Sequence, residues 1–140
     1  KITIISCYRV VQSSGADLGN ATAFVQQETL LRDHGVANPN PRVLGLQYLE
    51  VFVKKKSVAE EEVILSIDAN ETTAGGRGQL ANFVRRPGLI DAVASRHTSP
   101  PHTCIKGNRQ IDYIFISSNL SSTLLRSGHI GLQDAIFSDH

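Results

Sequence analysis

Two polar side chains, one residue apart, end an apolar stretch in the middle of the chain. Asp68 and Asn70 directly follow the run at 63–67. Alternate residues of an extended segment point the same way, so we expect the carboxylate and the amide to share one side. Such a carboxylate can orient or deprotonate a water, and the amide can donate to a phosphate oxygen. The same pair is also an ordinary turn or capping device, so its meaning depends on partners elsewhere in the chain.

Further carboxylates stand beside a histidine and an arginine. Asp112 lies inside the apolar segment QIDYIFIS, where a buried charge requires a partner. One candidate partner is His140, because a histidine that moves protons needs a carboxylate to fix its tautomer. The simpler alternatives are a salt bridge between Asp112 and Arg109 and a solvated His140.

A divalent cation would complete this set of side chains. Asp68 and Asp139 offer the oxygen ligands that suit Mg²⁺, with Mn²⁺ as the alternative. Together with Asn70, Asp112 and His140 they form a set that can hydrolyse a phosphodiester, because the cation stabilises the charge that develops.

The elements that position these residues follow from the spacing of apolar side chains. We predict strands at 2–7, 63–67, 102–105, 110–117 and 122–130, and helices at 21–34, 42–56 and 79–86. The stretch 89–95 fits either class. Asn20 is expected to be the N-cap of the first helix, and Gly35 to end it. Strands and helices in this order predict an α/β fold with a mixed sheet flanked by helices.

Composition excludes several classes of protein. The chain has 140 residues, 41% hydrophobic and 19% charged, which favours one globular domain over a disordered chain. A net charge of +1 does not by itself indicate a nucleic-acid binder. No apolar run is long enough to cross a bilayer, so we expect no membrane association through a span.

The cysteines and the glycosylation sequons bear on the compartment. Cys7 and Cys104 each fall in a predicted strand, and we expect reduced thiols without a disulfide. Sequons occur at Asn20, Asn70 and Asn119. Because a glycan on Asn70 would block the proposed site, we expect an intracellular protein, with the nucleus as one candidate location.

Four segments resemble one known superfamily. The segments SIDANETT, RQIDYIFIS and SDH, in this order, are similar to the endonuclease/exonuclease/phosphatase superfamily. Its relatives include deoxyribonuclease I, abasic-site endonucleases and LINE-type retrotransposon endonucleases. The segment IISCYRV resembles the strand that carries the family's tyrosine. The resemblance implies a deoxyribonuclease-I-like sandwich of two packed sheets flanked by helices, and a metal-dependent phosphodiesterase that acts on nucleic acid, with DNA favoured over RNA.

The resemblance also implies roles for the residues at the first strand end. Asp68 would activate the water and bind the metal, while Asn70 would contact the phosphate. Tyr8 would reach the same phosphate. Arg77, in the glycine-rich loop after Asn70, is placed to approach the substrate.

Later residues match the family as well, but earlier ones are missing. Asp112 would pair with His140, which would contact the scissile phosphate, and Asp139 would assist the metal site. The family's principal metal ligands, an Asn and a Glu, precede its tyrosine strand and have no counterpart here. We therefore expect residues 1–140 to be the middle and C-terminal part of one such domain, with the N-terminal sheet mostly missing. Such a chain should leave apolar surface uncovered and have weak or no activity alone.

Two choices stay open at this point. The chain has no Trp, which weighs against the inositol-phosphate phosphatases and leaves the nucleases and deadenylases. The basic stretches Lys54–Lys56 and Arg85–Arg86 are either nucleic-acid contacts or solvated surface. The alternative to an enzyme is a degenerate, non-catalytic fragment that acts only as a structural or binding module.

Overall fold

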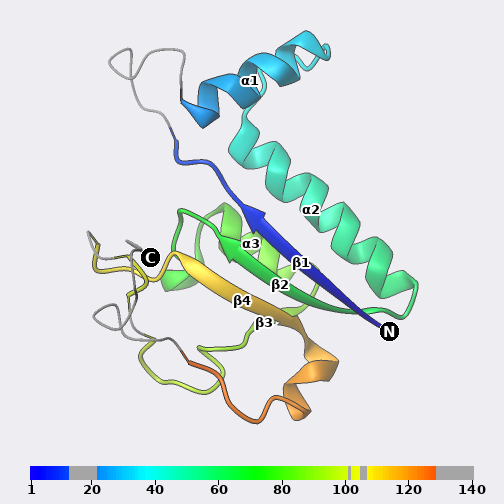
Figure 1. Ribbon diagram of the computed structural model, residues 1–140, viewed down its shortest axis with the longest axis vertical. Helices are drawn as coiled ribbons and strands as arrows, with labels where there is room; N and C mark the ends of the chain where they lie inside the picture. Colours follow the sequence, from blue (N-terminus) through cyan, green and yellow to red (C-terminus); the bar gives the residue numbers. More distant parts are fainter. Residues whose placement is uncertain (13–21, 101, 105–106, 129–140) are drawn as a thin grey trace.

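The computed structural model describes residues 1–12, 22–100, 102–104 and 107–128, and the described part is a mixed α/β fold (Figure 1). Its strands are β1 (Ile2–Tyr8), β2 (Glu62–Asp68), β3 (Leu89–Asp91) and β4 (Asp112–Ser117). Its α-helices are α1 (Ala23–Asp33), α2 (Pro41–Val58) and α3 (Gln79–Arg85), and the short 3₁₀ turns are η2 (Ala74–Gly76) and η3 (Ser118–Ser122).

The strands form one sheet in the order β1-β2-β4-β3. β1 and β2 are parallel, joined by a crossover through α1 and α2, whereas β4 runs antiparallel to both β2 and β3. The predicted mixed sheet is therefore confirmed. The carboxyl ends of β1 and β2 and the amino end of β4 meet at one end of the sheet (Figure 1).

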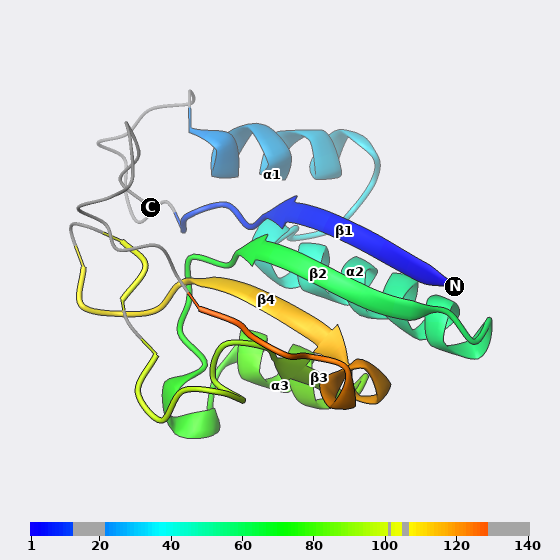
Figure 2. The same ribbon diagram turned by 60° about the horizontal axis from the view of Figure 1, so that its bottom comes forward.

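One face of the sheet holds the core. Alternate strand residues on this face pack against α2 and α3, which lie together on that side (Figure 2). Helix α1 contacts α2 and buries none of its own residues fully. The buried cluster consists of Leu46, Val53, Val63, Leu65, Ile67, Ala69, Leu80, Phe83, Leu89, Tyr113 and Phe115.

The opposite face of the sheet, which we call the open face, is only partly covered. Ile2 is 53% exposed, Ile4 76% and Ile114 42%, and no described helix covers them. Uncovered apolar surface was expected from the sequence, and the exposure of these isoleucines confirms it. On the same face, Asp68 and Asp112 are partly exposed, whereas Ile116 is buried.

The structure corrects two predicted strands. Residues 102–104 have no regular structure, so Cys104 is not in a strand. The reason is that the Thr103 hydroxyl accepts the backbone N–H groups of Ile111 and Asp112, both at 3.0 Å, and thereby ties this segment to the start of β4. The described part of 122–130 leaves η3 and continues without strand pairing. Its hydroxyl-rich sequence forms local bonds instead, such as Thr123 Oγ1 to the Leu120 carbonyl at 2.8 Å.

The ends of two other elements also differ from expectation. The N-cap of α1 is Thr22, whose hydroxyl accepts the N–H of Val25 at 3.3 Å, whereas Asn20 lies outside the described residues. The ambiguous stretch 89–95 begins as β3 and then turns. The turn follows because the Asp91 carboxylate accepts the N–H of Val93 at 2.9 Å.

Both cysteines are free thiols, and Cys7 is predicted to react slowly. Burial raises the pKa of the Cys7 thiol to about 11. Because the thiolate is the nucleophile, we expect alkylation by iodoacetamide at pH 8 to be roughly tenfold slower in the folded chain than after denaturation. Mass spectrometry of the Cys7 peptide over time measures both rates, and equal rates would contradict the burial of this thiol.

None of the described helices combines the length and the apolar character needed to cross a membrane.

Candidate functional site

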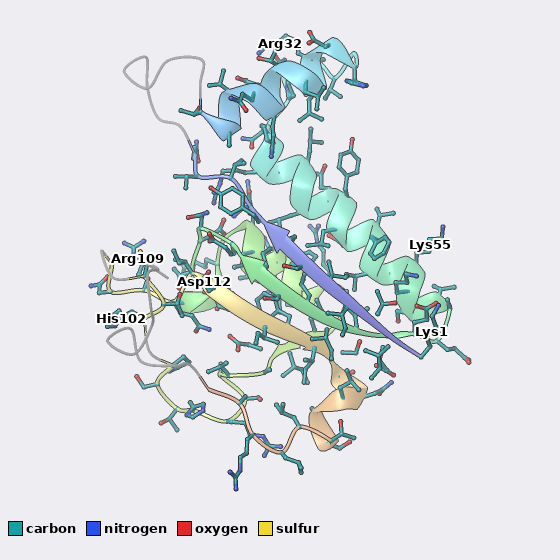
Figure 3. The ribbon with its side chains drawn as sticks, in the orientation of Figure 1. Lys1, Arg32, Lys55, His102, Arg109 and Asp112 are labelled. Carbon is teal, nitrogen blue, oxygen red and sulfur yellow. The ribbon has the colours of Figure 1, made fainter. Side chains whose placement is uncertain are left out.

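Strand register brings three of the predicted residues into one row. Tyr8 pairs with Asp68 across β1 and β2, and Asp68 pairs with Asp112 across β2 and β4. Paired residues of neighbouring strands point to the same face of a sheet. The row therefore lies on the open face, at the end of the sheet where the labelled Asp112 begins β4 (Figure 3).

The two carboxylates of this row are direct neighbours. Residues directly opposite on antiparallel strands have Cα atoms about 4.5–5.5 Å apart, and like charges in that position repel each other. Carboxylates this close can serve as oxygen ligands of a divalent cation, and a metal site here stays a prediction.

Asp68 and Asn70 also form a turn. Oδ1 of Asp68 accepts the backbone N–H of Asn70 at 3.1 Å, so the ordinary structural interpretation of the Asp–x–Asn pair holds, while the functional one stays a prediction. Asn70 has φ +46°, in the left-handed region that few non-glycine residues adopt. Its Nδ2 donates to the Arg9 carbonyl at 2.8 Å, which leaves the second amide hydrogen and Oδ1 for other contacts.

Tyr8, within this row, and Arg77, in the loop after Asn70, are both exposed. Tyr8 is 56% exposed at the end of β1. Arg77 is exposed in the glycine-rich loop that follows Asn70. This loop is tied to the sheet by the buried Tyr113, whose hydroxyl accepts the N–H of Thr73 at 3.0 Å. Tyr113 belongs to the helix-covered face, so this anchor lies on the other side of the sheet from the row of Tyr8, Asp68 and Asp112.

Two predicted residues fall in the part of the chain that is left undescribed. Asp139 and His140 lie outside the described residues. The pairing of Asp112 with His140 and the part of Asp139 in metal binding thus stay predictions. Within the described ranges, no group of three or more His, Cys, Asp or Glu side chains is placed to hold a metal ion.

The structure adds a buried ion cluster that sequence reasoning missed. Arg9 and Arg42 are only 5% and 7% exposed. Arg9 Nη1 lies 2.5 Å from Glu71 Oε2, and Arg42 Nη2 lies 3.5 Å from the same oxygen. Glu71 Oε1 accepts the N–H of Leu80 at 3.0 Å, near the start of α3. We call Arg9, Arg42 and Glu71 the arginine cluster.

Electrostatics within the arginine cluster favour the ionised form of the Glu71 side chain. Burial alone would raise the pKa of Glu71, but hydrogen bonds from the Leu80 N–H and from Arg9, with the charges of both arginines, lower it below its ordinary value. Burial lowers the pKa of Arg42, as does the positive charge of Arg9, while Glu71 opposes both. One carboxylate thus offsets part of the cost of burying two neighbouring cations.

A glycine makes room for this cluster. Gly78 has φ +100°, and a Cβ there would come within 2.6 Å of Glu71 Oε1. Sequence alone places Gly78 in the glycine-rich loop after Asn70, and no local pattern marks Arg9 and Arg42 as buried, since buried arginines are rare. A glutamate directly after Asp68–Asn70 was the only sequence signal for a buried partner, and it is a weak one.

The basic stretches considered as nucleic-acid contacts are engaged elsewhere. Lys54 lies 2.6 Å from Glu50, Lys56 lies 3.3 Å from Glu61, and Arg86 lies 3.1 Å from Glu50. The labelled Lys55 lies at the far end of α2 from Asp112 (Figure 3). These contacts favour the solvated-surface interpretation.

Comparisons of the chain with family models, with curated proteins and with solved structures find no match.

Proposed function

We propose that the chain forms one side of a metal-dependent phosphodiesterase site, most compatible with a nucleic-acid endonuclease. The observation that carries the proposal is the row of Tyr8, Asp68 and Asp112 on the open face, with Asn70 in the adjoining turn. Side chains separated by up to about a hundred positions in the sequence meet at one end of the sheet, as binding of a common substrate would require.

The chemistry assigned to each residue follows from its donor or acceptor groups. Asp68 orients the attacking water and accepts its proton. Asn70 donates its remaining amide hydrogen to a non-bridging phosphate oxygen, and Tyr8 donates its hydroxyl hydrogen to the same phosphate. Arg77 approaches the backbone of a nucleic acid from the neighbouring loop. His140, paired with Asp112, is proposed to contact the scissile phosphate.

Mg²⁺ or Mn²⁺ is proposed as the cofactor because the available donors are carboxylate and amide oxygens. Asp68 and Asp139 are the proposed ligands, and Asp112 faces Asp68 across β2 and β4 as the proposed partner of His140. A cation held there supplies positive charge to the phosphate in the transition state. Two carboxylates are few ligands for Mg²⁺, so we expect weak binding and weak turnover by this chain.

The proposed architecture is the deoxyribonuclease-I-like sandwich. The support for it is the mixed sheet, the helices on one face, and the exposed Ile2, Ile4 and Ile114 on the other. A second sheet packed on this face would bury these isoleucines and would enclose the row of polar side chains from above.

Nicking of supercoiled plasmid, with Mg²⁺ or with EDTA, tests the proposed activity. At high protein concentration we expect slow, Mg²⁺-dependent nicking, which Asp68→Asn lowers by at least about 100-fold because the water loses its base. A labelled RNA in parallel reactions decides between DNA and RNA. Broadening of the Asp68 and Asp112 amide NMR signals by Mn²⁺ reports the metal site without turnover.

A matched variant separates catalysis from general damage. Asp33→Asn removes an exposed carboxylate at the end of α1 and should leave nicking unchanged. The proposal fails if Asp68→Asn nicks as fast as the unmodified chain, or if neither nicking nor Mn²⁺ broadening at this edge is found.

The second candidate function is a non-catalytic binding or structural module. The observation that favours it is the exposed apolar face around Ile4, which is 76% exposed. A module of this kind would show no Mn²⁺ broadening at Asp68, and Ile4→Lys would abolish its association with a partner.

A further inference from the structure

Arg9 contacts every residue of the segment Asp68–Glu71. Its backbone N–H donates to the Asp68 carbonyl at 2.8 Å. Its Nη1 donates to the Ala69 carbonyl at 3.3 Å and to the Glu71 carboxylate at 2.5 Å. Its own carbonyl accepts the side-chain amide of Asn70 at 2.8 Å. The backbone of Arg9 thus makes the contacts to Asp68 and Asn70, and its guanidinium makes those to Ala69 and Glu71.

The guanidinium of Arg9 is itself immobilised. Its Nε donates to the Arg42 carbonyl at 3.1 Å, and its Nη2 donates to Gln79 Oε1 at 2.5 Å. Arg42 in turn donates to the Asn70 carbonyl at 3.2 Å. The buried guanidinium of Arg9 therefore connects the end of β1, the start of α2 and the start of α3 to the turn after β2.

We propose that Arg9 is the positioning residue of the site: its guanidinium holds the turn at 69–71 from the Ala69 carbonyl and the Glu71 carboxylate, and this turn carries the Asn70 amide. The part of this inference that concerns turnover rests on the proposed function. Arg9 is only 5% exposed, so it would act on turnover through the turn that it holds.

The backbone of Asn70 explains why such support is needed. A non-glycine residue at φ +46° persists only where its surroundings hold it there. The Arg9 carbonyl, which binds the Asn70 side chain, and Arg42, which binds the Asn70 carbonyl, hold the residue from both sides. Without the Arg9 guanidinium the turn would relax, and the Asn70 side-chain amide would leave its position beside Asp68.

Arg9→Lys is the decisive variant. Lysine keeps the positive charge but cannot span the Ala69 carbonyl, Glu71 and Gln79 at once, because its ammonium is a single point. Arg86→Lys is the matched control, since Arg86 also pairs with a glutamate but is 60% exposed. Both variants are made in the 140-residue chain and ¹⁵N-labelled for NMR.

We expect Arg9→Lys to shift the Asn70 side-chain amide signals and the backbone amides of 69–71. Their hydrogen exchange should accelerate by about tenfold or more, while Arg86→Lys leaves them unchanged. In the nicking assay, kcat should fall about 10- to 100-fold with KM nearly unchanged, because misplacement of reacting groups affects turnover more than binding. If Arg9 had a purely structural role, Arg9→Lys would lower only the folded fraction of the chain.

The remaining outcomes also decide the inference. If Arg9→Lys folds and its signals for 69–71 match those of Arg86→Lys, Arg9 does not position the site. If Arg9→Lys does not fold, Gln79→Ala removes one anchor of the guanidinium, and the absence of any shift at Asn70 in that variant overturns the inference. If the unmodified chain shows neither nicking nor Mn²⁺ binding, the proposed function fails, but the NMR comparison still decides whether Arg9 orders this turn.

Discussion

Phe115→Ala is expected to lower the free energy of unfolding by about 3–5 kcal/mol. Phe115 is 0% exposed, and its ring stacks on Tyr113 with centroids 5.0 Å apart and planes 9° from parallel. Removing the ring leaves a cavity between the central strands and the two helices that cover them. Urea unfolding followed by circular dichroism measures the loss.

The neighbouring residue provides the control for Phe115. Ile114 precedes Phe115 in β4 but points to the open face, where it is 42% exposed. Ile114→Ala should cost less than about 1 kcal/mol, because little apolar area is returned to water. Similar losses for Ile114→Ala and Phe115→Ala would contradict the assignment of a buried and an open face.

Glu71→Ala is expected to lower the free energy of unfolding by about 3 kcal/mol, the low end of the range for removing one partner of a buried ion pair. The low end applies because the Glu71 side chain is 21% exposed. The substitution leaves Arg9 and Arg42 as two neighbouring buried cations without their carboxylate, and the Leu80 N–H without its acceptor. A stability loss of less than about 1 kcal/mol would show that water compensates both arginines.

The dependence of stability on pH gives an independent measure of the same carboxylate. Since the folded-state pKa of Glu71 is lowered, its contribution is fully present above its unfolded value and is lost as the pH falls towards the lowered one. Glu71→Gln should therefore lose less stability than the unmodified chain between pH 6 and the acid range. Glu61, whose pKa is lowered to about 2 by Thr3, Lys1 and Lys56, titrates in both proteins and cancels in the difference.

The strands and helices that carry the site were predictable because their signals are local. Alternating apolar residues place Asp68 at the end of β2 and Tyr8 at the end of β1, and Asn40 with Pro41 marks the start of α2. Local signals failed where side-chain hydroxyls competed with strand pairing. The Thr103 hydroxyl and the hydroxyls after Ser117 bind nearby backbone groups, so two predicted strands did not form.

The candidate site also has a part that the sequence predicted and a part that only the structure decided. The residue types Asp, Asn and Tyr at strand ends suggested phosphate chemistry from the sequence. Whether Asp112 would face Asp68 was a matter of register, because a slip of one residue would have turned Asp112 to the helix side. The sequence therefore indicated the components of the site, and the pairing of β2 with β4 decided that two of its carboxylates meet.

The amino-acid order alone specified an α/β chain with amphipathic strands, polar strand tips and no paired cysteines. Only the folded chain decided that Arg9 and Arg42 are buried and that one carboxylate holds both. The reason is distance along the chain: Arg9 and Glu71 are 62 positions apart, and no local pattern records a contact of that span. Periodicity reports which side of an element is apolar, whereas the pairing of charges depends on which elements pack together.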